Sequence, residues 1–156
     1  MTDIVVCKAS LDDVHELVEL MKAFYAESSF PLDRQWAANS FMQLLSTPAL
    51  GGVWLARAGA RAVGHAVLSV RYTMEYAALG GYIDDLYVTP EFRRQQVATR
   101  LLHALAEECR DRACASLHVE VSGSNIAALA TYKRFGLAPA TDGRLLLSGA
   151  VPAAGA

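Results

Sequence analysis

The sequence predicts an α/β protein in which strands and helices alternate along a single domain. Runs rich in β-branched and aromatic residues alternate with segments whose apolar residues recur at helical spacing. With 156 residues and 53% hydrophobic content, the chain is long enough for one sizeable core and short for two. We therefore expect one domain over residues 1–149 and a disordered tail of small residues over 150–156.

Charge and composition argue against several classes of protein. A net charge of −2 gives no general positive field for nucleic acid. No apolar stretch approaches the roughly 20 residues of a membrane span, and no basic segment precedes the first apolar run, so we expect a cytoplasmic protein. The three cysteines contain no C-x-x-C pair and the four histidines have no metal-type spacing. We expect free thiols and no metal.

The N-terminal part predicts a strand followed by two helices. Residues 4–9 form a β-rich run, and Ser10 with Asp13 is typical of a capping box at a helix start. The apolar face of this helix is Val14, Leu17, Val18, Met21, Phe24 and Tyr25. The stretch "SSFPLD" ends it, and a second helix over about 33–45 is indicated by Trp36, Phe41, Leu44 and Leu45.

The middle of the chain predicts a hairpin and then a separate strand. Two β-rich arms flank the turn Ala58-Gly59-Ala60, and "ALGG" at residues 78–81 ends the hairpin. The next strand is "YIDDLYV", residues 82–88, with Pro90 soon after it. Regular alternation along this strand predicts that Asp84 and Asp85 point to opposite faces of the sheet.

The C-terminal part continues the alternation. From Val97 onward the apolar positions predict a helix, namely Val97, Leu101, Leu102, Leu105 and Cys109. A strand over residues 115–121, a helix over 125–135 that Gly136 stops, and a short last strand over 144–149 follow.

The loop before the helix at Val97 is a candidate anion site. The first N–H groups of a helix lack partners within the helix, and the helix dipole favours a negative ligand. Loops of this kind often use glycine, yet the inner positions here are Gln95, Gln96, Val97 and Ala98. The alternative reading of this segment alone is a surface connection with two solvated arginines.

Two blocks within residues 83–137 together resemble the GNAT superfamily of acyl-CoA-dependent N-acyltransferases. They are "LYVTPEFRRQQVATRLL" and "NIAALATYKRFGL". The family pattern is met at Arg93, Ala98, Asn125, Ala128, Tyr132 and Gly136. The sequence departs from it at Gln96, where the loop's first glycine is usual, and at Leu137, where phenylalanine is usual.

The resemblance implies a mixed, splayed sheet flanked by helices, with acetyl-CoA bound in the gap between residues 82–88 and 115–121. The pantetheine arm would pair with the strand backbone, and the pyrophosphate would lie on loop N–H groups. The implied cofactor-binding residues are Leu86, Tyr87, Val88, Arg93, Arg94, Gln95, Gln96, Val97, Ala98, Thr99 and Asn125. A left-handed conformation at Gln96 would cost about 1 kcal/mol and weaken the binding of acetyl-CoA without abolishing it.

The resemblance also implies the chemistry. Tyr132 matches the general acid at the leaving thiolate; otherwise it is a core tyrosine. Asp84 matches an acidic base of polyamine-type members and is preferred as the base, with Asp85 as the alternative. If Asp85 is not the base, it would bind a cationic substrate or end a loop. The acceptor pocket would draw on Tyr25, Glu75, Tyr76 and Glu120, each of which is otherwise an ordinary surface or packing residue.

The function expected from this resemblance is acetyl transfer from acetyl-CoA to a primary amine, of a small cationic or polyamine-like kind, with a homodimer left open. Two alternatives remain. A degenerate GNAT domain would bind acyl-CoA as a sensor or scaffold without turnover, and a non-catalytic α/β module would bind another phosphate ligand or a protein.

Overall fold

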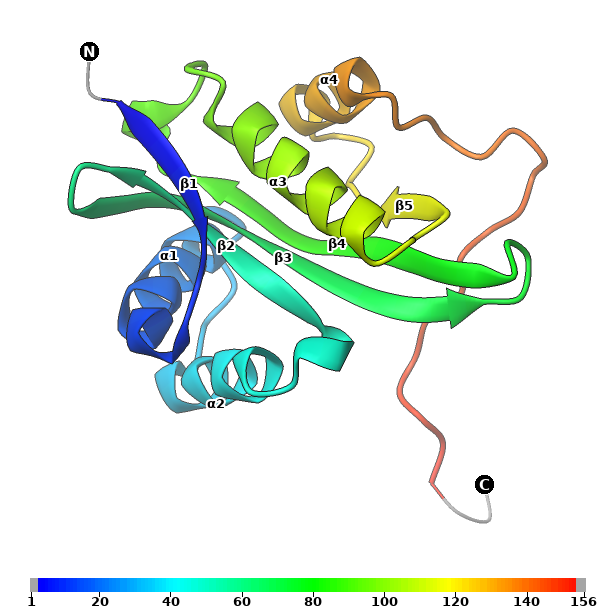
Figure 1. Ribbon diagram of the computed structural model, residues 1–156, viewed down its shortest axis with the longest axis horizontal. Coiled ribbons are helices and arrows are strands. Elements are labelled where there is room, and N and C mark those ends of the chain that lie inside the picture. The colour runs from blue at the N-terminus through cyan, green and yellow to red at the C-terminus, as the bar shows by residue number, and fades with distance from the viewer. Residues whose placement is uncertain (1–2, 154–156) are drawn as a thin grey trace.

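The computed structural model describes residues 3–153 and contains a five-stranded mixed sheet with helices on both faces (Figure 1). The strand order is β1-β2-β3-β4-β5, with antiparallel pairs throughout except for the parallel pair of β4 and β5. The elements are β1 (Ile4–Lys8), α1 (Val14–Glu27), α2 (Arg34–Leu45), β2 (Gly51–Ala58), β3 (Arg61–Thr73), β4 (Ala78–Val88), α3 (Val97–Asp111), β5 (Ser116–Val119) and α4 (Ile126–Phe135). The predicted fold class is confirmed.

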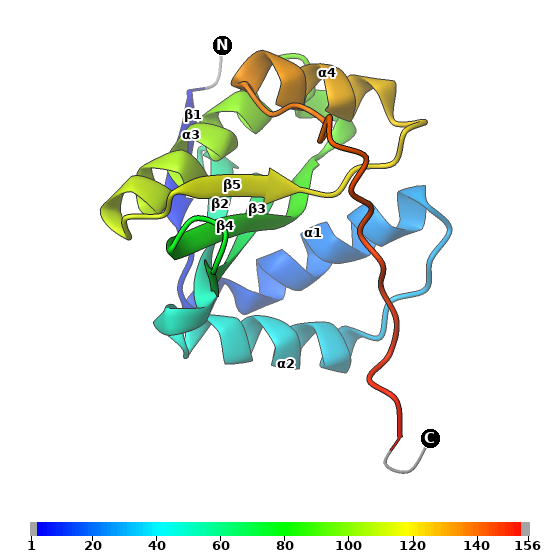
Figure 2. The same cartoon turned by 90° about the vertical axis from the view of Figure 1, so that its right-hand side faces the viewer.

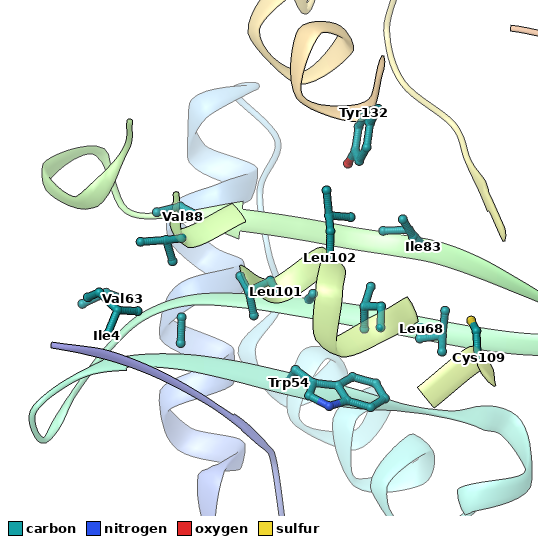
Figure 3. Close-up of a cluster of buried hydrophobic side chains, with 14 residues drawn as sticks. Ile4, Trp54, Val63, Leu68, Ile83, Val88, Leu101, Leu102, Cys109 and Tyr132 are labelled. Carbon is teal, nitrogen blue, oxygen red and sulfur yellow. The ribbon is translucent and has the colours of Figure 1, made fainter. Parts of the chain in front are cut away.

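The sheet separates two apolar clusters. Helices α1 and α2 cover one face, while α3 covers the other and α4 lies beside α3 (Figures 1 and 2). On the α3 side the predicted apolar positions of the helix are all buried, and Figure 3 shows this cluster, with Leu102 facing Tyr132 of α4 and Cys109 near Leu68 of β3. On the other side Leu17, Met21 and Phe41 pack on Val67 and Tyr87 of the sheet.

The two N-terminal helices begin as predicted. The reciprocal hydrogen bonds of the capping box join Ser10 and Asp13 and stabilise a short 3-10 turn before α1. Asp33 caps α2, with its Oδ1 accepting a hydrogen bond of 2.7 Å from the N–H of Trp36. Of the apolar residues that indicated this helix, Phe41 is buried, whereas Trp36 has 56% of its surface exposed.

The stretch "ALGG" begins β4 and does not end the hairpin, so that prediction is wrong. The turn lies earlier, at residues 74–77, and β3 and β4 pair from Thr73 and Ala78 onward. Glycine is required here by close packing: a Cβ added at Gly80 would lie 2.8 Å from Ser116 Oγ, and one at Gly81 would lie 2.6 Å from Cys109 Sγ.

The last predicted strand, residues 144–149, is also wrong. This segment is irregular, and Leu145 and Leu147 are 85% and 87% exposed. A β-rich run forms a strand only when a neighbouring strand supplies hydrogen bonds, and no sheet ladder of the described residues includes this segment. Residues 150–153 are irregular and exposed too, while the rest of the predicted tail lies outside the described residues.

Three further features of residues 3–153 bear on function. No helix there is long and apolar enough to cross a membrane, and no three His, Cys, Asp or Glu side chains gather as a metal site. Cys7, Cys109 and Cys114 are all free thiols.

Candidate functional site

The pairing of strands β4 and β5 ends halfway along β4. Their parallel pairing runs from Gly80 and Ser116 to Ile83 and Val119, whereas the pairing of β4 with β3 continues to Val88. The β5-facing backbone edge of residues 84–88 therefore has no strand partner in the ladder of the described residues. This is the splay that the sequence resemblance implied, and the predicted pantetheine-pairing residues Leu86, Tyr87 and Val88 lie along it.

A β-bulge occurs where this splay begins. Val67 of β3 pairs with Asp85 and Leu68 pairs with Ile83, so Asp84 is the extra residue of β4. The bulge reverses the alternation of side chains, because Ile83 packs in the α3-side cluster and Tyr87 in the other one. The prediction that Asp84 and Asp85 point to opposite faces is therefore wrong.

Both carboxylates line one cavity of about 530 Å³ between α1, α2, β3 and β4. Tyr25 of α1 and Ser69 of β3 line it as well. Its other walls are mainly apolar, from Met21, Phe41, Leu44, Leu50, Val67 and Val70. The structure thus brings three of the predicted site residues, Tyr25, Asp84 and Asp85, into a single hollow that combines negative charge with apolar surface.

The cavity alters the acidity of its titratable groups. Asp84 is exposed at the mouth of the cavity, but the atoms around its carboxylate partly desolvate it and raise its pKa. The charges of Asp85 and Glu120 raise this pKa further, against an opposing contribution from Ser69. Burial also raises the pKa of Tyr25, with the charge of Asp85 adding to it. Asp84 therefore holds its proton more readily than a fully solvated aspartate does.

Tyr132 reaches this region from the opposite face of the sheet. Its ring, 8% exposed, extends from α4 toward β4 and α3 (Figure 3). Burial raises the pKa of its hydroxyl to about 12, with a further contribution from Asp85. The Asp85 carboxylate is thus within electrostatic reach of Tyr25 on one side and Tyr132 on the other.

The loop before α3 adopts the left-handed backbone that glycine usually supplies. Arg94 and Gln96 have φ of 61° and 63°, two residues apart, and no side chain caps α3. The N–H groups of Val97, Ala98 and Thr99 have no acceptor within the helix, because the first intrahelical hydrogen bond is the one that Arg100 N–H donates to Gln96 O. Successive N–H groups in such a turn form a concave anion site.

Other predicted cofactor-binding side chains are engaged within the protein. The Nε of Arg93 donates a hydrogen bond of 2.9 Å to Val88 O, and its guanidinium pairs with Glu27. Gln95 Nε2 donates to Glu91 O at 3.0 Å. Asn125 caps α4 through Oδ1, which accepts a 3.2 Å hydrogen bond from the N–H of Ala128. Contacts of these three residues with acetyl-CoA stay predictions.

Glu75 and Tyr76 lie apart from the carboxylate cavity. They line a hollow of about 260 Å³ at the β3–β4 turn, where Tyr82 stacks on His118 and Glu75 pairs with Arg144. Glu120 follows β5 and is exposed, close enough to raise the pKa of Asp84 without lining its cavity.

Sequence reasoning gave no role to His65, which lies behind the cavity. It is the buried polar residue of the described chain, with Nε2 3.9 Å from Asp85 Oδ2. The signal in the sequence was a single imidazole in the otherwise apolar run "AVGHAVL".

Curated relatives share parts of the sequence. Over 74 residues the chain is 31% identical to a thialysine N-epsilon-acetyltransferase of Bos taurus, covering 46% of this chain and 44% of the relative. Over 69 residues it is 36% identical to the ribosomal protein bS18-alanine N-acetyltransferase of Escherichia coli K12, covering 38% and 47%. The chain thus matches less than half the length of either relative.

Solved structures cover nearly the whole chain. An integron cassette protein from the mobile metagenome of Cole Harbour Salt Marsh superposes with a TM-score of 0.85 at 34% identity, covering 95% of this chain and 91% of that one. A predicted acetyltransferase from Clostridium acetobutylicum, solved with acetyl-CoA, has a TM-score of 0.77 at 22% identity, covering 94% and 96%, and shares the fold. The model of the acetyltransferase (GNAT) family matches residues 12–137. The chain therefore belongs to the GNAT acetyltransferase family.

Proposed function

We propose that this protein transfers the acetyl group of acetyl-CoA to the primary amine of a small cationic acceptor. The observation that carries the proposal is the β4 bulge, which places Asp84 and Asp85 together in one cavity at the point where β4 leaves β5. The names of both curated relatives, which include N-acetyltransferase, support the reaction class.

The donor fits the splayed edge of the sheet. Pantetheine amides can pair with the backbone of residues 86–88, as a strand would, and the pyrophosphate can accept hydrogen bonds from N–H groups between Arg94 and Thr99. Backbone donors do not depend on side-chain identity, so a loop without glycine remains suited to this role.

The reaction needs a base, an attacking nitrogen and a protonated leaving group. Asp84 takes one proton from the ammonium, and the free amine then forms a bond to the thioester carbon. As the C–S bond breaks, the Tyr132 hydroxyl gives its proton to the sulfur and receives the second proton from the nitrogen. The products are the amide, CoA thiol and a protonated Asp84, and Tyr132 ends as it began.

The cavity favours an acceptor with one cationic end and an apolar body. Asp85 can hold an ammonium while the apolar walls from α1, α2 and β3 accommodate hydrocarbon. A polyamine would leave further charges against these walls. We therefore expect arylalkyl or alkyl monoamines to be acetylated with a higher kcat/KM than spermidine.

Turnover is tested by thiol release from acetyl-CoA with a panel of amines, alongside thermal melts with acetyl-CoA and with ATP. We expect amine-dependent thiol release and a larger rise in Tm with acetyl-CoA than with ATP, because only a ligand of the native state stabilises it. No Tm shift at millimolar acetyl-CoA would exclude the donor assignment.

A second function is favoured by one observation, the left-handed Gln96 in place of glycine. A GNAT domain that has lost turnover would still bind acyl-CoA and would act as a sensor or scaffold. A Tm shift with acetyl-CoA, combined with no thiol release for any amine in the panel, would support this function over catalysis.

A further inference from the structure

The inference concerns His65 of β3 and rests on the proposed function. Its side chain has no exposed surface, and neither ring nitrogen has a hydrogen-bond partner among the described residues. Nε2 lies 3.9 Å from Asp85 Oδ2, just beyond hydrogen-bonding distance. This imidazole is thus buried with one carboxylate within reach.

The remaining surroundings of His65 are aromatic and apolar. Its ring centroid lies 6.2 Å from that of Phe41, edge-on at 80°, and 6.2 Å from that of Tyr87. A buried donor or acceptor without a partner costs about 1–3 kcal/mol, whereas an apolar side chain would fill the same space without this penalty. A small rotation of Asp85 toward Nε2 would remove the cost for one nitrogen.

We propose that His65 is a positioning residue for the acceptor amine, with its Nε2–H donating to Asp85 Oδ2 when an ammonium binds. The hydrogen bond fixes one carboxylate oxygen and leaves the other facing the cavity for the ammonium. Asp85 is otherwise faced by Asp84 from its own strand, Tyr25 from α1 and Tyr132 from α4, while the polar side chains that α2 contributes to the cavity, Ser40 and Gln43, are uncharged.

Two amide variants separate positioning from packing. In His65→Gln the amide nitrogen stands near the place of Nε2, and in His65→Asn it stands near that of Nδ1. We expect His65→Asn to raise KM for the amine about tenfold with kcat changed less than threefold, and His65→Gln to stay within about threefold of wild type in both. Thermal melts of both variants establish that each is folded at the assay temperature.

The contact is then tested by a double-mutant cycle with Asp85→Asn. If His65 acts through Asp85, His65→Asn changes KM by less than twofold in the Asp85→Asn background. The same tenfold change in both backgrounds would overturn the proposal, and so would equal losses in His65→Gln and His65→Asn.

Nitrogen-15 NMR of His65, recorded with saturating amine, gives a readout that does not need turnover. We expect the proton on Nε2, and a change of the Nε2 resonance in Asp85→Asn. A proton on Nδ1, or an Nε2 resonance indifferent to Asp85→Asn, would overturn the inference even in an active enzyme. The expected NMR result in a protein without turnover would instead count against the proposed function alone.

Discussion

The two halves of β4 differ in their neighbours and in what their residues do. From Gly80 to Ile83 the strand pairs on both sides, and its glycines allow close packing against Cys109 and Ser116. From Asp84 to Val88 it pairs with β3 only. The bulge at Asp84 directs the carboxylates of Asp84 and Asp85 toward the same cavity. Residues that stabilise the fold and residues proposed for chemistry are thus adjacent in a single strand.

The boundary between the halves explains why both features occur together. A bulge bends a strand and increases its twist, which carries the second half of β4 away from β5. The same extra residue places Asp84 beside Asp85. Substitutions on the two sides of this boundary should therefore separate loss of activity from loss of stability.

The largest effect is expected for Asp84→Asn, which removes the proposed base. We expect kcat/KM to fall by about 10²- to 10⁴-fold, the usual range for a general base. Asp85→Asn is the matched control, since it removes a carboxylate from the same cavity and should raise KM more than it lowers kcat. Equal losses of kcat in the two variants would contradict the assignment of Asp84 as the base.

The raised pKa of Asp84 makes the same variant informative about pH. The base is active when ionised, so the rate of the wild type should rise with pH through a limb above the ordinary aspartate value of 3.8. In the pH window between the ordinary and raised values the folded state holds a proton that the unfolded state has lost, so stability falls as pH rises. Asp84→Asn should therefore lack this limb and melt at a slightly higher temperature at pH 7.

Tyr132→Phe is expected to lower kcat by about ten- to a hundredfold while the Kd of acetyl-CoA changes less than twofold. The phenyl ring keeps the packing against Leu102 and Ile83, and only the hydroxyl is lost. Because burial raises the pKa of Tyr132 to about 12, the wild-type hydroxyl stays protonated at neutral pH. Stopped-flow turnover and titration calorimetry measure the two effects, and an unchanged kcat would remove Tyr132 from the mechanism.

Gly81→Ala tests the paired half of β4. The added Cβ would lie 2.6 Å from Cys109 Sγ and 3.2 Å from the side chains of Leu68 and Leu117, so we expect a loss of about 1–3 kcal/mol in unfolding free energy from overpacking. Gly123→Ala is the control, because no atom lies within 4 Å of its added Cβ. Urea titration measures both, and kcat per folded molecule should stay close to wild type in each.

The elements of this fold that depend on local pattern were predictable, and those that depend on a neighbour were not. The apolar spacing of α3 and the caps at Ser10, Asp33 and Gly136 depend only on residues that are close together in the sequence. From the sequence alone, Gly80 and Gly81 predict the end of a strand. They are needed inside β4 because Ser116 and Cys109, from distant segments of the chain, approach them closely.

The candidate site shows the same division. Tyr132, Asp84 and the loop at Gln96 could be predicted as site residues from motif resemblance, and these roles stay predictions. The bulge could not, because it is a mismatch in register between β3 and β4 that neither strand shows alone. His65 was missed for a related reason, since its proximity to Asp85 arises only from the pairing of those strands.

The smallest effect is expected for Gln96→Gly, in the loop that leads away from the unpaired half of β4. At φ 63° a non-glycine residue is disfavoured by about 1–2 kcal/mol, whereas glycine loses about 0.5–1 kcal/mol more conformational freedom on folding. These terms nearly cancel, so Tm should move by no more than a few degrees.

Removal of the side chain from the proposed pyrophosphate site should tighten acetyl-CoA by up to about fivefold, or about 1 kcal/mol. Gln96→Ala is the control, because it removes the side chain while keeping a Cβ at the left-handed position. If Gln96→Gly tightens acetyl-CoA and Gln96→Ala does not, backbone freedom is responsible, and equal tightening in both assigns the effect to side-chain crowding. Weaker binding in both variants, measured by titration calorimetry, would mean that the glutamine amide contacts the ligand and that the loop without glycine is adapted to it.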